Sequence, residues 1–266
     1  MSSPAYDAIL QVIGVAYTYQ PSRAMRRRLT ANLTRHHSSQ TQDFSYFFKS
    51  EPEHVVRSGM PLRLRAGLDG EESVPHWPEP ELVVLLGPDH EPVGYTLGND
   101  LTAFAIEARG RDERFDGTYF GKCWPGSCAL GPRFVTPEEL GDDGAVEITM
   151  RITRGGERIY QYVYSTSRRT RAFSTVPDLV VEHYGRYLSD PPPSKRVRMD
   201  PGGGRLRAGT AIMLGAGVIV PSRAYCQEGD VITVSCPQIG ELTNTVARAE
   251  PARTGLASRA LRAGLP

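Results

Sequence analysis

The stretch 78–100 determines the fold that we expect for this chain, and it reads PEPELVVLLGPDHEPVGYTLGND. Residues 82–86 are continuously apolar, which is typical of a strand buried on both faces, and residues 93–97 form a second strand-like run. The segment 87–92 between them is dense in turn-forming residues. The pattern therefore predicts a β-hairpin.

Three acidic residues lie at the open end of this predicted hairpin. Glu79 and Glu81 are separated by one residue, so on an extended strand they point to the same face. If the turn is symmetric about its middle, Glu79 lies opposite Asp100. Carboxylates this close repel one another, and a hard divalent cation relieves the conflict because Mg²⁺, Mn²⁺ and Ca²⁺ prefer carboxylate oxygens. The spacing indicates a metal site, and the alternative is that the acids lie on a solvated strand end.

Length and composition indicate one large domain, or one domain with a small appendage: the chain has 266 residues, 39% of them hydrophobic, and a net charge of +1. This charge gives no global attraction to nucleic acid or membrane, and no apolar run could span a bilayer. Residues 9–15 are apolar but lack the preceding basic region of a signal peptide. The four cysteines form no CxxC pair, which argues against zinc or a disulfide framework. We therefore expect a cytoplasmic protein without nucleic-acid or membrane partners.

Most of the remaining predicted elements are strands. Residues 146–152 and 159–164 predict a second hairpin. Further strands are expected at 62–64, 211–220, 231–235 and 239–246, and helices at 101–108 and 176–188. If Asp100 capped the first helix, its carboxylate would bind backbone N–H groups instead of a metal. The predicted architecture is α+β and mainly β, a mixed curled sheet with peripheral helices.

Two other segments offer groups for chemistry. Lys122 lies in the Gly- and Pro-rich segment 121–132, which predicts a loop, and it is a candidate to hold an anion; the alternative is a solvated lysine. Residues 36–42 are polar and predict a mobile lid that begins with His36 and His37. Either histidine is a candidate catalytic residue. Adjacent residues of a strand point to opposite faces, so the two are not expected to serve one site together.

Four short motifs occur along the chain in the order in which a known family has them. They are Phe47-Phe48-Lys49, Pro-Glu-Pro-Glu-Leu at 78–82, Gly-Tyr-Thr-Leu-Gly-Asn-Asp at 94–100 and Ser-Cys-Ala-Leu-Gly-Pro at 127–132. Together they resemble the fumarylacetoacetate hydrolase superfamily, and within it the 2-keto-3-deoxy-D-arabinonate dehydratase branch. The resemblance covers roughly residues 44–246.

The resemblance implies a β-roll like the fumarylacetoacetate hydrolase C-terminal domain, usually in a homodimer, with Mg²⁺ or Mn²⁺ held by three carboxylates. These would be Glu79, Glu81 and Asp100, with Lys122 as the family lysine. In such enzymes the metal chelates a keto acid and stabilises an enolate. Dehydration, C–C hydrolysis and decarboxylation can all follow from that enolate.

The resemblance also suggests a division of the chain. Residues 1–60 would form a small N-terminal region with a lid at about 22–43. Residues 61–247 would form the metal-dependent catalytic β-roll, and residues 248–266 a poorly ordered tail.

The motifs depart from the family pattern where substrate is bound. The family arginine and acid that follow Asn-Asp are replaced by Phe104 and Ala105, and the late Thr-Gly-Thr appears as Leu214-Gly215-Ala216. With Phe104, Gly215 and Ala216 as substrate contacts, we expect a substrate larger or more hydrophobic than a sugar acid, and a biosynthetic role in specialised metabolism. The predicted function is a metal-dependent lyase, a dehydratase of a keto-acid or β-dicarbonyl-like substrate. The alternatives are an acylpyruvate-type hydrolase or decarboxylase, and a non-catalytic ligand-binding homologue.

Overall fold

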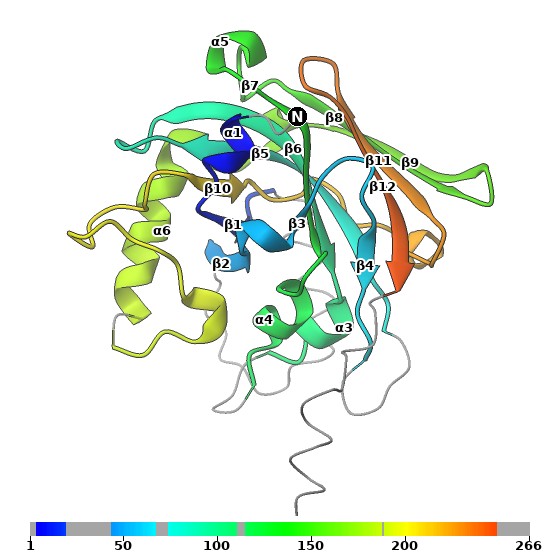
Figure 1. Ribbon diagram of the computed structural model, residues 1–266, viewed down its shortest axis with the longest axis horizontal. Coiled ribbons are helices and arrows are strands. Elements are labelled where there is room, and N and C mark those ends of the chain that lie inside the picture. The colour runs from blue at the N-terminus through cyan, green and yellow to red at the C-terminus, as the bar shows by residue number, and fades with distance from the viewer. Residues whose placement is uncertain (1–3, 20–43, 68–73, 111–114, 188, 249–266) are drawn as a thin grey trace, which may run out of the picture.

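Two mixed β-sheets with short peripheral helices make up the fold (Figure 1). The computed structural model describes residues 4–19, 44–67, 74–110, 115–187 and 189–248. The seven-stranded sheet has the order β2-β1-β10-β5-β6-β7-β3, and the five-stranded sheet the order β4-β12-β11-β8-β9. The prediction of a mainly β, α+β fold is therefore confirmed.

The strands are β1 (Gln11–Ala16), β2 (Ser45–Ser50), β3 (Val55–Val56), β4 (Leu62–Leu64), β5 (Trp77–Leu86), β6 (Pro92–Thr102), β7 (Cys128–Val135), β8 (Glu147–Arg154), β9 (Glu157–Ser165), β10 (Thr210–Met213), β11 (Val231–Cys236) and β12 (Gly240–Arg248). The α-helices are α1 (Pro4–Asp7), α3 (Phe104–Glu107), α4 (Gly117–Lys122), α5 (Pro137–Leu140) and α6 (Val176–Tyr184). None of the helices within the described ranges is long and apolar enough to cross a membrane.

The hairpin β5–β6 lies at the centre of the seven-stranded sheet. Its two strands are antiparallel, and Glu79 pairs with Asp100 while Leu82 pairs with Leu97. All ten residues of β5 are buried, and the hairpin is paired on both edges, with β10 on one side and β7 on the other. The predicted hairpin and its register are confirmed.

Side chains of this hairpin alternate between two environments. Leu82 and Leu97 point into the larger core, where they join residues of the five-stranded sheet such as Ile148 and Val234. On the opposite face, near the turn, Val83 packs in a second apolar cluster with residues of β1, β7 and β10. Burying each such side chain stabilises the fold by about 1.5–3 kcal/mol. The acidic residues continue this second face towards the open end of the hairpin.

Three predicted elements are corrected by the structure. The helix expected over 101–108 is only α3, because β6 continues to Thr102, which pairs with Trp77 of β5, and the Leu101 N–H donates to the Ser127 carbonyl. Ala103 occupies the N-cap, so Asp100 does not cap this helix. The loop expected over 121–132 contains the end of α4 and the start of β7, whose Gly-Pro pair lies at a shift in strand register. The strand expected over 211–220 is limited to β10.

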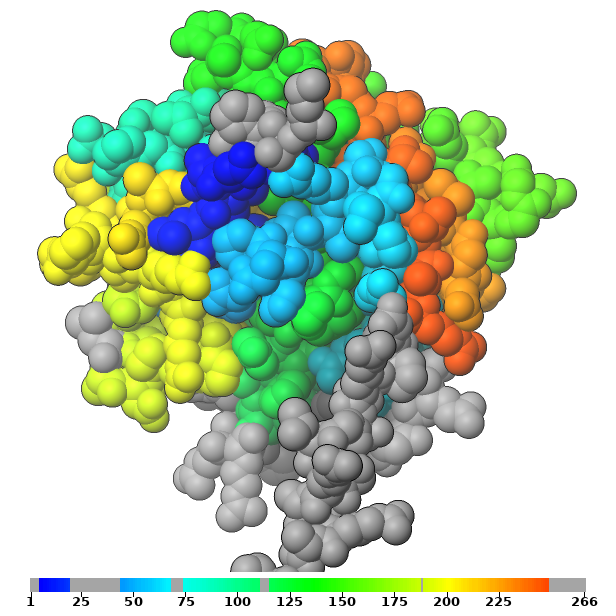
Figure 2. Space-filling model, in the orientation of Figure 1, coloured from blue at the N-terminus to red at the C-terminus, as the bar shows by residue number. Residues whose placement is uncertain are grey.

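The first 60 residues contribute β1, β2 and β3 to the same sheet as the central hairpin. The predicted lid at about 22–43, with His36 and His37, lies outside the described residues, as does the predicted tail beyond residue 248. The second predicted hairpin is confirmed as β8–β9. It projects from the body of the molecule at the right of Figures 1 and 2.

Candidate metal centre

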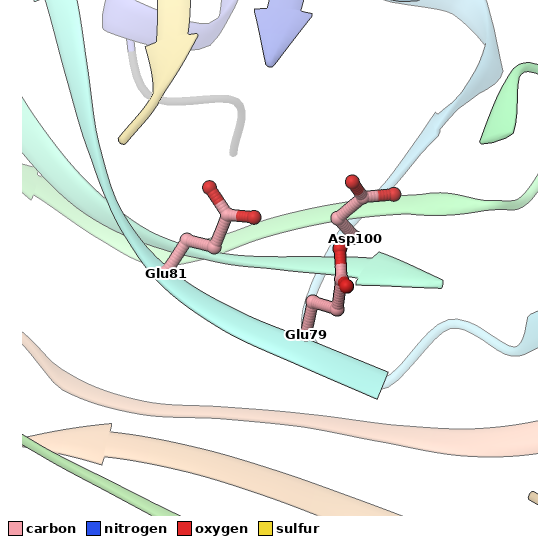
Figure 3. Close-up of side chains that lie close together, drawn as sticks. All are labelled: Glu79, Glu81 and Asp100. Atoms are coloured by element: carbon pink, nitrogen blue, oxygen red, sulfur yellow. The ribbon is translucent and has the colours of Figure 1, made fainter. Parts of the chain in front are cut away.

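Glu79, Glu81 and Asp100 rise from one face of the β5–β6 hairpin and converge (Figure 3). One carboxylate oxygen of each lies within 4.8 Å of the others, and all three residues are buried. The convergence follows from the strand period, which turns Glu79 and Glu81 to the same face, and from the register that places Asp100 beside them. The predicted cluster is therefore present, and the solvated-strand alternative is wrong.

Lys122, predicted to lie in a loop, is the buried last residue of α4 and reaches into this cluster. Its Nζ donates to Glu79 Oε2 at 2.7 Å, to Asp100 Oδ2 at 2.8 Å and to Thr102 Oγ1 at 2.7 Å. Gly121 allows this placement, because a side chain there would collide with the backbone of Glu107 in α3. Lys122 is therefore not a solvated lysine.

Lys49 is a second buried lysine of the cluster, and its role was not predicted. Its Nζ lies 2.5 Å from Asp100 Oδ1 as an ion contact without hydrogen-bond alignment. The available signal was a single lysine directly after three aromatic residues in strand β2, since a lysine is buried only when it is paired. The sequence could not identify the partner, because the strand pattern does not show which distant segments lie above it.

The electrostatics of the cluster favour an added cation. Burial raises the pKa of Glu81 well above its usual range, and the Asp100 and Glu79 carboxylates raise it further, against the opposing effects of Lys122 and of the Gly215 N–H. Three carboxylates facing two ammonium groups leave an excess negative charge when all are ionised. Divalent cations with a preference for oxygen ligands remove this conflict.

Gly215 and Ala216 line a cavity of about 10 Å³ beside the three carboxylates. This volume has room for about one small ion or water molecule. The Gly215 N–H donates to Glu81 Oε2 at 2.5 Å, and its positive φ of 87° and contact with Thr18 exclude a side chain at this position. The backbone at Gly215 thus comes directly against one of the three carboxylates.

Phe104 packs on Trp77, with ring centroids 4.3 Å apart. Among the described residues, Phe104 is not part of the lining of the cavity beside the carboxylates. Its role in substrate binding stays a prediction. A much larger hollow of about 1000 Å³ lies near the turn of the hairpin, around Tyr95 and Arg169, and its described lining contains none of the three clustered acids.

The sequence model of the fumarylacetoacetate (FAA) hydrolase C-terminal family matches residues 11–247. The chain belongs to this family. It is 31% identical over 201 residues to a protein of Haloferax volcanii named "Probable 2-keto-3-deoxyxylonate dehydratase", covering 75% of this chain and 59% of that one. It is 29% identical over 203 residues to 2-dehydro-3-deoxy-D-arabinonate dehydratase of Saccharolobus solfataricus, covering 75% and 57%.

The chain thus spans less than two thirds of the length of these two relatives. The fold is similar to that of 2-keto-3-deoxy-D-arabinonate dehydratase solved with magnesium and 2,5-dioxopentanoate. The TM-score is 0.65 at 21% identity, over 92% of this chain and 75% of that one. This likeness, like the family match, supports the fold. The carboxylate cluster itself fits Mg²⁺ or Mn²⁺ because all three candidate ligands are buried carboxylate oxygens within reach of one ion.

Proposed function

We propose that this chain is a magnesium- or manganese-dependent lyase that dehydrates a small keto-acid-like substrate through an enolate. One observation carries the proposal: three converging carboxylates lie beside a buried lysine in a chain related to keto-deoxy-sugar-acid dehydratases. The magnesium in a solved structure of similar fold supports the choice of metal.

In this proposal Glu79, Glu81 and Asp100 hold the metal. The bound ion would act as a Lewis acid towards the carboxylate and 2-oxo group of the substrate. Lys122 lies within hydrogen-bond distance of two of these carboxylates, and its positive charge is proposed to orient and stabilise an anionic oxygen of the substrate at the same site. Burial of the lysine excludes water from these contacts and strengthens them.

A histidine of the predicted lid, His36 or His37, is proposed to shuttle the proton. Separate His36→Ala and His37→Ala variants test this assignment. Loss of turnover in one variant, with metal binding retained, is the expected result. Unchanged turnover in both would exclude the lid histidines from proton transfer.

The reaction is tested by incubating the chain with Mg²⁺ and a panel of 2-keto acids, followed by product analysis by mass spectrometry. The panel contains 2-keto-3-deoxy sugar acids, analogues with apolar chains in place of the sugar hydroxyls, and acylpyruvates. Dehydration yields a product one water lighter than the substrate. Cleavage of an acylpyruvate into two fragments would instead assign the acylpyruvate-type hydrolase, and no product from any member would contradict the enzyme proposal. Glu81→Gln is the matched control, because it removes one candidate ligand's charge at nearly constant volume.

A further inference from the structure

Asp100 is held between two ammonium groups. Lys49 Nζ lies 2.5 Å from its Oδ1, and Lys122 Nζ lies 2.8 Å from its Oδ2. All three side chains are at most 1% exposed. The two oxygens of this carboxylate therefore face different lysines, and the lysines differ in how they are anchored.

Lys49 is anchored to the main chain. Besides Asp100, its ammonium donates to the Leu101 carbonyl at 3.2 Å, the Lys122 carbonyl at 2.5 Å and Ser127 Oγ at 3.1 Å. These carbonyls belong to β6 and α4, so they move only if those elements move. Because an ammonium has three donors, Lys49 cannot follow the Asp100 carboxylate if it rotates.

Lys122 is anchored differently, because its Nζ donates hydrogen bonds to the side chains of Glu79, Asp100 and Thr102. Side chains can readjust around a ligand at lower cost than two backbone elements. Of the two oxygens of Asp100, Oδ1 is thus the one that is fixed, and Oδ2 is the one that can be given to a cation.

This difference matters for the size of the cation. Ca²⁺ takes six to eight oxygens at 2.3–2.6 Å and often binds both oxygens of one carboxylate, whereas Mg²⁺ requires six near-octahedral ligands at 2.0–2.1 Å and retains waters. Binding of a cation by both oxygens of Asp100 would disrupt the contact with Lys49 and leave a buried ammonium without its counter-ion, which is costly. Glu81 is constrained in the same sense, since its Oε2 accepts the Gly215 N–H at 2.5 Å.

We propose that Lys49 is a positioning residue that sets the ion selectivity of this site. By holding Asp100 Oδ1, it leaves a single oxygen of that carboxylate for the metal and so favours Mg²⁺ or Mn²⁺ over Ca²⁺. The inference rests on the metal site of the proposed function and is independent of the reaction catalysed there.

Titration of the wild-type chain with Mg²⁺, Mn²⁺ and Ca²⁺ by isothermal calorimetry gives the first test. Tighter binding of Mg²⁺ or Mn²⁺ than of Ca²⁺ is expected. Absence of binding by all three ions would overturn the metal centre and the proposed function with it. Equal or tighter binding of Ca²⁺ would overturn only the role of Lys49.

Lys49→Met is the second test, with Lys195→Met as its matched control. Lys195 donates to Ser45 Oγ at 2.9 Å and to the Tyr46 carbonyl, so the control removes the same charge and similar contacts without affecting a candidate ligand. The ratio of Ca²⁺ to Mg²⁺ affinity is expected to rise about tenfold in Lys49→Met, a typical effect of losing a residue that orients a ligand, and to stay constant in the control.

An unchanged ratio in Lys49→Met would contradict the proposal, even if both affinities fell, because a structural role alone weakens both ions equally. If Lys49→Met does not fold, the ratio of Ca²⁺ to Mg²⁺ affinity is measured in Lys49→Gln instead. Its amide still donates to a carboxylate oxygen, so the ratio is expected to lie between those of the wild type and Lys49→Met.

Discussion

The hairpins β5–β6 and β8–β9 are both built from two long antiparallel strands, but one is buried and the other lies partly at the surface. In β5–β6 every residue of the first strand is buried, and the hairpin carries the charged cluster. In β8–β9 the second strand forms the edge of its sheet, with residues such as Val163 exposed. Strand pairing therefore does not by itself make a site. The site arises where other segments, including Phe47 and Gly215, cover the face that carries the charged residues, so that those charges must be satisfied by one another or by a metal.

The largest effect is expected from Glu81→Gln, which removes one charge from the buried face of β5–β6. Mg²⁺ affinity should fall at least about 100-fold, because the variant lacks a direct ligand. Loss of a residue that only supports a ligand already lowers metal affinity by about 10–100-fold. The stability of the fold should change much less, since Glu81 has a raised pKa and its charged form is costly to bury. Calorimetric titration checks the affinity, and an unchanged value would exclude Glu81 as a ligand.

The core face of the same hairpin is tested by Leu97→Ala. Leu97 is fully buried opposite Leu82, so the free energy of unfolding should fall by about 2–5 kcal/mol through lost contacts and the cavity created. The denaturant midpoint measures this loss. Mg²⁺ affinity in the folded variant should remain close to the wild-type value, since Leu97 points away from the carboxylates. A large change in affinity would show that the two faces of the hairpin are not independent.

Stability at mildly acidic pH is expected to depend on His76, which directly precedes β5. Burial lowers the pKa of His76 to about 4, and its Nε2 accepts the Arg65 N–H at 3.2 Å. Between the ordinary value of 6.5 and about 4, the unfolded chain binds a proton that the folded chain does not. The stability contribution is therefore complete above pH 6.5 and is lost as the pH falls towards 4.

His76→Gln should remove this part of the pH dependence, which amounts to at most about 3 kcal/mol. Denaturant unfolding at pH 7 and pH 4.5, for the wild type and for the variant, measures the difference. Replacement of the exposed His54 by Gln is the control and should leave the wild-type slope intact. Identical slopes for His76→Gln and the wild type would show that His76 is not held neutral by the fold.

The sequence predicted the central hairpin and its acids because both depend on local pattern. Residues 82–86 define a buried strand, and a symmetric turn fixes Glu79 opposite Asp100. The role of Lys49 depends instead on carbonyl and hydroxyl groups more than fifty residues away, which no local pattern reveals. The helix expected over 101–108 was wrong for the same reason, because pairing with β5 extends the strand to Thr102, beyond what its residues indicate. Contacts with distant segments thus determine whether a charged side chain is buried and where a strand ends.

The smallest effect is expected from Val163→Thr on the exposed edge of β8–β9. Val163 is 42% exposed, and threonine keeps the β-branched shape that suits a strand, so the free energy of unfolding should change by less than about 0.5 kcal/mol. A loss above about 1 kcal/mol would contradict the view that this edge faces solvent. It would indicate that another chain covers it, and the homodimer predicted from the family resemblance supplies such a chain. Sedimentation of the wild type and of Val163→Thr at matched concentrations separates the two cases, because only a covered edge links loss of stability to dissociation.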